Sequence, residues 1–192
     1  MLWQCVKFPG LIRQAAKKIM QALTFWKTIT MDKSDLLEQF LGVLQQHNVR
    51  YCVIGGQGVN AYVEPLVSLD LDIVIAIEQL EAVEALLATS FNLQHFPHSL
   101  NVSVPGSDLR IQIQTDPRYY DFVDRATEQE VLGLVLPVAS IEDLLQGKVW
   151  AAQDPQRRAS KRQKDLADIA RLLEAEPSLR SRVPSQILDR LL

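Results

Sequence analysis

The residues best suited to chemistry lie in two short motifs that are close together in the sequence. Gly55 and Gly56 follow a short apolar run, and Asp70 and Asp72 alternate with apolar residues over 69–76. Two consecutive glycines let the backbone turn sharply and offer unhindered N–H groups to an anion such as a triphosphate. Alternate residues of a strand point to one face, about 6.5–7 Å apart. Two carboxylates side by side repel unless a cation lies between them, and oxygen ligands suit Mg²⁺ bound partly through phosphates.

The order of the elements around these motifs is more informative than either motif alone. Gly-Gly by itself is usually a turn, and Asp-x-Asp is usually the solvated face of a strand. Here residues 50–54 predict a buried strand that ends at the glycines, and residues 57–64 predict a short helix that stops before Pro65. The Asp-x-Asp then falls on a second apolar strand, so the ordered set indicates a site for a nucleotide and a cation.

Ile54-Gly55-Gly56 followed by Asp70-Leu71-Asp72 resembles the signature of the DNA polymerase beta-like nucleotidyltransferase superfamily. Within it, the sequence looks most similar to small prokaryotic nucleotidyltransferases that include the abortive-infection toxins of toxin–antitoxin pairs. Residues 141–152 and 157–174 resemble the C-terminal part of that group, where one helix carries a Lys and the next carries Lys-Asp-x-x-Asp. The resemblance covers about residues 34–176. It implies an α/β fold with a mixed β-sheet flanked by helices, and a C-terminal helical extension.

The resemblance also implies an activity and a set of site residues. The expected reaction transfers NMP from an NTP, in the presence of Mg²⁺ or Mn²⁺, to a hydroxyl of an RNA, a protein or a small molecule. An antitoxin-like protein is the implied partner. Asp70 and Asp72 would be catalytic and hold the metal, and the expected nucleotide-binding residues are Gly55, Gly56, Gln57, Lys148 and Lys164.

One position departs from the superfamily pattern. Its members usually supply a third carboxylate from a neighbouring strand, which completes the metal site and helps to deprotonate the attacking hydroxyl. The candidate strand, 108–114, has Leu109, Ile111 and Ile113 on its apolar face, so Gln112 is expected at the position of the third acid. An amide oxygen can coordinate a metal but cannot act as a base. Asp108 and Asp116 flank the strand and are the alternatives.

Three functional hypotheses therefore remain open. The first is an active nucleotidyltransferase. The second is a catalytically impaired nucleotide-binding or toxin–antitoxin regulatory protein that lacks the third carboxylate. The third is a toxin-like subunit that mainly holds a protein partner, with the basic N-terminal helix as the docking element. The side chain at position 112 separates the first two.

Charge is distributed unevenly along the 192 residues. Residues 1–31 carry five basic and no acidic side chains, so with a net charge of −3 the remainder carries −8. We expect a basic amphipathic extension (1–31), a nucleotidyltransferase core (32–139) and a helical part (140–192). The extension suits a membrane surface or an acidic partner, or else is an over-extended start or a loosely attached helix outside the core. The acidic remainder argues against broad nucleic-acid binding.

The remaining patterns indicate a cytoplasmic protein. No run is long and apolar enough to span a membrane, and Cys5 and Cys52 are far apart, as for free thiols in a reducing compartment. Further helices are expected from 32 or 34 to 46 and over 77–89, 118–125, 141–152, 158–174 and 184–192, and further strands over 91–96, 100–104 and 131–137. On the helix 158–174, Lys161, Lys164, Asp168 and Arg171 predict an exposed stripe, with Lys161–Asp165 and Lys164–Asp168 as possible pairs within the helix.

Overall fold

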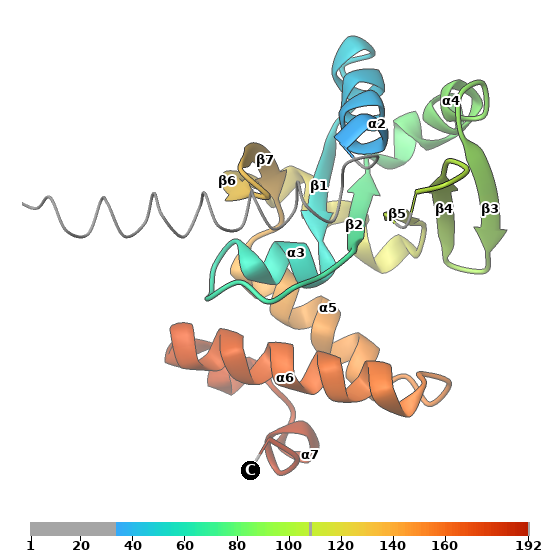
Figure 1. Cartoon of the computed structure of the whole chain (residues 1–192). Helices are drawn as coiled ribbons and strands as arrows, with labels where there is room; N and C mark the ends of the chain where they lie inside the picture. The colour runs from blue at the N-terminus through green and yellow to red at the C-terminus, as the bar shows by residue number, and fades with distance from the viewer. Residues whose placement is uncertain (1–33, 108, 192) are drawn as a thin grey trace, which may run out of the picture.

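The computed structural model describes residues 34–107 and 109–191, and its centre is a seven-stranded mixed sheet (Figure 1). The strand order is β3-β4-β5-β2-β1-β7-β6. The sheet contains β1 (Tyr51–Ile54), β2 (Asp70–Ile75), β3 (Asn92–Phe96), β4 (Ser99–Ser103), β5 (Arg110–Gln114), β6 (Thr127–Val131) and β7 (Leu134–Val138). This sheet and its flanking helices confirm the predicted α/β class.

The three central strands fix the positions of the motif residues. β1 runs antiparallel to β2, and β2 runs parallel to β5. Asp72 is paired with Ile54 on one side and with Gln112 on the other. Leu71 and Ile73, which alternate with the two aspartates, are fully buried, each stabilising the fold by about 1.5–3 kcal/mol. The apolar alternation therefore determines which face of β2 carries the carboxylates.

The helices form two groups around the sheet. α2 (Ser34–Gln46) and α4 (Ile77–Leu87) lie in the upper part of Figure 1, whereas α3 (Gly55–Asn60), α5 (Ile141–Gln153), α6 (Ala159–Ala175) and α7 (Ser185–Leu188) lie in the lower part. Two 3₁₀ helices, η1 (Pro117–Arg125) and η2 (Pro177–Arg182), complete the described elements. The lower group includes the predicted C-terminal helical extension.

Three local details differ from the sequence-based expectation. The short helix after β1 begins at Gly55 and ends at Asn60, earlier than expected at both ends. The strand expected over 131–137 is a hairpin of β6 and β7, because Leu132 and Gly133 both have positive φ and form a two-residue turn. β6 was missed because its sequence, TEQEV, is polar and lies at the edge of the sheet. The last expected helix is shorter, and η2 precedes it.

The basic extension 1–31, Cys5 and Asp108 lie outside the described residues. Cys52 is a buried free thiol. In the described part of the chain, none of the helices has the length and apolar character needed to cross a membrane. The boundary at residue 139 and the cytoplasmic location remain predictions.

Candidate active site

A cleft of about 150 Å³ separates the sheet from α5 and α6. The sheet contributes Asp70, Asp72 and Gln112, Gly55 comes from the start of α3, and the opposite side contributes basic residues from α5 and α6. The cleft-lining residues that bear on chemistry are Gly55, Gly56, Ser68, Asp70, Asp72, Gln112, Tyr119, Lys148, Arg157, Lys161, Lys164 and Asp165. Residues more than a hundred positions apart in the sequence thus meet in one cavity.

The glycine turn lies against the Asp72 carboxylate. Gly55 has a φ of +64°, and a Cβ at this position would lie 2.0 Å from Asp72 Oδ2. Both the backbone conformation and the lack of space therefore require glycine. A Cβ at Gly56 would be 3.5 Å from Ser68 Oγ and 3.9 Å from Lys164 Nζ, which is ordinary contact distance. Gly55 is thus the more constrained of the two.

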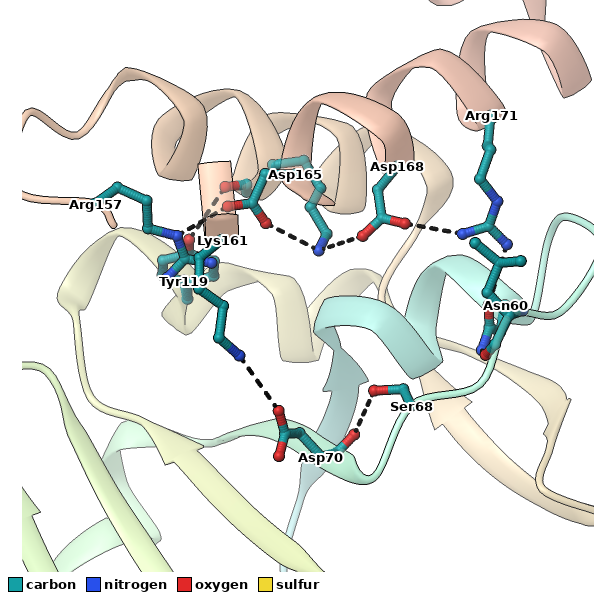
Figure 2. A network of polar contacts seen from close by, with 12 residues as sticks. Asn60, Ser68, Asp70, Tyr119, Arg157, Lys161, Asp165, Asp168 and Arg171 are labelled. Atoms are coloured by element: carbon teal, nitrogen blue, oxygen red, sulfur yellow. Dashed lines mark hydrogen bonds and ion pairs between the residues drawn. The ribbon is translucent and has the colours of Figure 1, made fainter. Parts of the chain in front are cut away.

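The two carboxylates of β2 have different surroundings. Asp70 Oδ1 lies 3.0 Å from Arg110 Nη2, and its Oδ2 lies 3.5 Å from Lys161 Nζ, as Figure 2 shows for Lys161. Among the described residues, Asp72 has no cation within ion-pair distance. Burial raises the pKa of Asp72, an effect opposed by the field of Lys148 and reinforced by Asp70. Among the described residues, the direct cationic partners of the pair therefore all contact Asp70, and none contacts the Asp72 carboxylate.

Oxygen ligands of this kind fit Mg²⁺ or Mn²⁺. Asp70 and Asp72 lie on the same face of β2, and the described residues contain no group of three or more His, Cys, Asp or Glu side chains that could hold a metal alone. A hard cation bound by two carboxylates takes further oxygens from phosphates and water. The donor set fits a metal that is bound together with a nucleotide.

The position expected for a third acid is next to Asp72. Gln112 is paired with Asp72 in the β2–β5 register and lines the cleft. Asp116 is not among the residues lining the cleft. It caps η1 and binds the Arg118 guanidinium, with the shortest contact at 2.6 Å, and this hydrogen bonding lowers the pKa of Asp116. Within the described residues, no carboxylate from β5 joins the pair on β2.

Lys148 is buried between two carboxylates of α6. Its Nζ lies 3.2 Å from Asp165 Oδ1 and 2.6 Å from Asp168 Oδ2. Burial alone would lower the pKa of Lys148, but the attraction of Asp168 and Asp165 raises it overall. Asp165 also binds Arg157 at 2.8 Å, and Asp168 binds Arg171 at 2.8 Å (Figure 2). Lys148 reaches the cleft wall as part of a buried ionic cluster.

This cluster corrects the interpretation of α6 as an exposed stripe. Asp165 and Asp168 are buried, with 2% and 1% of their surface exposed. The expected Lys161–Asp165 and Lys164–Asp168 pairs do not form, because both carboxylates point to Lys148 on α5. Residues four apart on a helix can pair, but a buried partner on a neighbouring helix is the stronger attraction. Lys161 and Lys164 face the cleft instead.

Gln57, Tyr119 and Lys161 lie differently from what the sequence indicated. Gln57 is buried, and its Nε2 donates a hydrogen bond to Ser68 O at 2.8 Å, so it holds the loop and does not line the cleft. Tyr119 lines the cleft and packs edge-on against Trp150. Sequence reasoning missed Tyr119 because the 3₁₀ helix carrying it has no periodicity that indicates a site. Lys161 also lines the cleft, although it was expected only in the exposed stripe.

Comparison with solved structures identifies the fold. The structure of ANT(2″)-Ia in complex with adenylyl-2″-tobramycin matches with a TM-score of 0.52 and 14% identity, over 77% of this chain and 97% of that chain. An antigenic nucleotidyltransferase-like protein from Paracoccidioides brasiliensis matches with a TM-score of 0.53 and 16% identity, over 84% and 88%. A putative nucleotidyltransferase from Thermotoga maritima matches with a TM-score of 0.50 and 16% identity, over 72% and 95%. These likenesses show a shared nucleotidyltransferase fold.

The family follows from a sequence comparison. No curated protein matches the chain. The model of the nucleotidyl transferase AbiEii toxin family, described as part of a type IV toxin–antitoxin system, matches residues 63–190. The match includes Asp70, Asp72, Lys148 and Lys164 and begins after the glycine turn. It covers well over half of the chain and confirms the resemblance noted above: the chain belongs to the AbiEii nucleotidyltransferase toxin family.

Proposed function

We propose that this protein is a metal-dependent nucleotidyltransferase that moves NMP from an NTP to a hydroxyl and releases pyrophosphate. The observation that carries the proposal is the composition of the cleft. One cavity combines the carboxylates of Asp70 and Asp72 with the ammonium groups of Lys161 and Lys164. Phosphoryl transfer needs this combination, because catalysis there consists mainly of positioning and of balancing the triphosphate charge.

In this proposal, the carboxylates on one side of the cleft bind the metal, and the basic residues on the other side interact with the phosphates. Asp70 and Asp72 hold Mg²⁺ or Mn²⁺, which when bound neutralises charge on the triphosphate. Gly55 and Gly56 offer backbone N–H groups to the phosphates. Lys164 is exposed and has no ion-pair partner among the described residues, so it is free to bind a phosphate oxygen. Lys148 is already bound by two carboxylates and acts on the nucleotide mainly through its field.

Gln112 limits the rate of nucleotide transfer that we expect. The superfamily mechanism takes the acceptor proton with a third carboxylate, and the amide next to Asp72 cannot do so. We expect slow transfer for this reason. The alternative function, a nucleotide-binding or regulatory protein of a toxin–antitoxin pair without turnover, rests on the same residue. The acceptor remains open between an RNA, a protein and a small molecule, and the family description supports an antitoxin as the cognate partner.

A transfer assay with NTP radiolabelled at the α-phosphate tests this proposal. RNA, bulk protein and the protein itself serve as acceptors, with Mg²⁺ or Mn²⁺. We expect slow, metal-dependent labelling that Asp72→Asn abolishes, and a gain of about tenfold or more in Gln112→Glu, since a positioned general base contributes roughly 10²–10⁴-fold.

Three results would contradict parts of the proposed function. Transfer that survives Asp72→Asn would contradict the site. Fast wild-type transfer that is unaffected by Gln112→Ala would contradict the missing base. Tight NTP binding without transfer, in both the wild-type protein and Gln112→Glu, would favour the non-catalytic alternative.

A further inference from the structure

The loop that leads into β2 is held by side chains. Residues 61–69 connect α3 to Asp70, the first residue of β2. Leu66 N donates a hydrogen bond to Asn60 Oδ1 at 3.0 Å, and Asn60 Nδ2 donates to Leu66 O at 2.7 Å. Ser68 O accepts the bond from Gln57 already described. The position of this loop therefore depends on Asn60 and Gln57 of α3.

Arg171 connects this loop to α6. Its Nη2 donates to Asn60 Oδ1 at 3.1 Å and to the backbone oxygen of Glu64, and its Nη1 donates to Asp168 Oδ1 at 2.8 Å. Figure 2 shows the Arg171 guanidinium between Asp168 and Asn60. The Arg171 side chain is only 17% exposed. One planar group thus joins two elements more than a hundred residues apart in the sequence.

The contacts continue from Arg171 in two directions to residues that line the cleft. On one side, Asp168 binds Lys148, which binds Asp165, which binds Arg157. On the other side, the loop contains Ser68, whose Oγ donates a hydrogen bond to Asp70 O at 3.4 Å. Ser68, Asp70, Lys148 and Arg157 all line the cleft. Arg171 lies behind the cleft and is not among its lining residues.

Charge balance does not require Arg171. Lys148 and Arg157 already neutralise Asp165 and Asp168, so Arg171 is a third cation for two carboxylates. Its particular property is the forked geometry, which lets one nitrogen bind Asp168 while the other binds the loop. A lysine would keep the charge but lose this span.

Asp70 depends on the loop more than Asp72 does. Asp72 is paired with strands on both sides, whereas the β1–β2 register ends at Asp72 and Asp70 is paired only with Arg110 of β5. We propose that Arg171 is a positioning residue: by binding the loop 61–69 to the buried ionic cluster, it fixes Ser68 and the carboxylate of Asp70 at the metal position. This inference rests on the proposed function of Asp70 as a metal ligand.

Hydrogen exchange and kinetics together test the proposal. We compare wild type with Arg171→Lys, with Arg171→Met and with the control Arg180→Ala, which removes an exposed arginine of η2 that is not part of the cleft. Exchange is measured on the metal-free protein. In both Arg171 variants we expect the Leu66 amide to exchange at least tenfold faster, with unchanged rates in α2 and in β3–β4.

The kinetic measurement separates positioning from general stability. In Arg171→Lys, the Mg²⁺ concentration for half-maximal transfer should rise at least fivefold, while KM for NTP measured at saturating Mg²⁺ stays within twofold, because Lys161 and Lys164 remain in place. The control should match wild type in both measurements.

Two outcomes would overturn the role of Arg171. One is wild-type exchange of the Leu66 amide in both variants. The other is faster exchange spread evenly over α2 and the sheet, which would mean a purely structural role. A wild-type protein without transfer would contradict the proposed function instead. The exchange comparison, which needs no nucleotide, would still decide whether Arg171 holds the loop.

Discussion

The protein contains two pairs of carboxylates at nearly the same sequence spacing, in opposite situations. Asp165 and Asp168 on α6 are buried and bind three cations, Lys148, Arg157 and Arg171. On β2, Asp70 and Asp72 face the cleft. Of these two carboxylates, only Asp70 forms ion pairs with other described residues. Those partners, Arg110 and Lys161, are 65% and 40% exposed, so solvent screens their attraction.

The difference shows that the surroundings of an acidic pair decide its role. The charge of a buried carboxylate surrounded by cations is already neutralised, and removing a partner weakens that compensation in a site without solvent. The two carboxylates on β2 repel each other and still have oxygen atoms that can coordinate a metal. A divalent cation bound between them therefore reduces their repulsion. We therefore assign a structural role to the α6 pair and a ligand-binding role to the β2 pair.

Removing the cation at the centre of the α6 pair should have the largest effect on stability. Lys148→Met removes one charged contact from each of the two buried carboxylates, which keep only Arg157 and Arg171, and we expect a loss of about 3–5 kcal/mol in the free energy of unfolding, since each bond to a charged group contributes roughly 1.5–3 kcal/mol. Lys164→Met is the matched control, since Lys164 is exposed, and its effect should stay within about 0.5 kcal/mol. Urea denaturation measures both. Equal stabilities for the two variants would mean that the cluster is not structural.

Substitution of the two glycines in the turn next to Asp72 should change stability and nucleotide binding by different amounts. Gly55→Ala forces a positive φ on alanine and places a Cβ against the Asp72 carboxylate, so we expect a loss of about 1–3 kcal/mol together with weaker Mg²⁺·NTP binding. Gly56→Ala meets only ordinary contacts, and its effect on stability should be small, about 1 kcal/mol or less in either direction. Denaturation and nucleotide titration of both variants check this order. Weaker binding in Gly56→Ala than in Gly55→Ala would contradict the assigned constraint.

Sequence periodicity predicted the β2 pair well because it depends on local rules. Alternation placed Asp70 and Asp72 on one face, and the same alternation in 109–113 identified Gln112 as the neighbour that the register places beside Asp72. Most core helices and strands also followed from apolar patterns. The polar edge strand β6 did not, since its residues carry no apolar alternation.

The α6 pair could not be predicted because the cation that both carboxylates share comes from another helix. Asp165 and Asp168 looked like helix-surface residues within reach of Lys161 and Lys164 at four-residue spacing. Their observed partner Lys148 comes from α5, and Arg171 reaches a loop more than a hundred residues earlier in the chain. Such contacts depend on how the helices pack, which a single sequence does not reveal.

The most direct test of the central claim is a calorimetric titration with a non-hydrolysable NTP analogue, with and without Mg²⁺. The proteins are wild type, Asp70→Asn/Asp72→Asn and the control Asp121→Asn, an exposed acid outside the cleft. We expect Mg²⁺ to raise affinity at least tenfold in wild type and control, and to have no effect in the double variant. The double variant should unfold at the same temperature as wild type or higher, since like-charge repulsion is removed. A double variant that keeps the Mg²⁺-dependent gain would contradict the assignment of the β2 pair as the metal site.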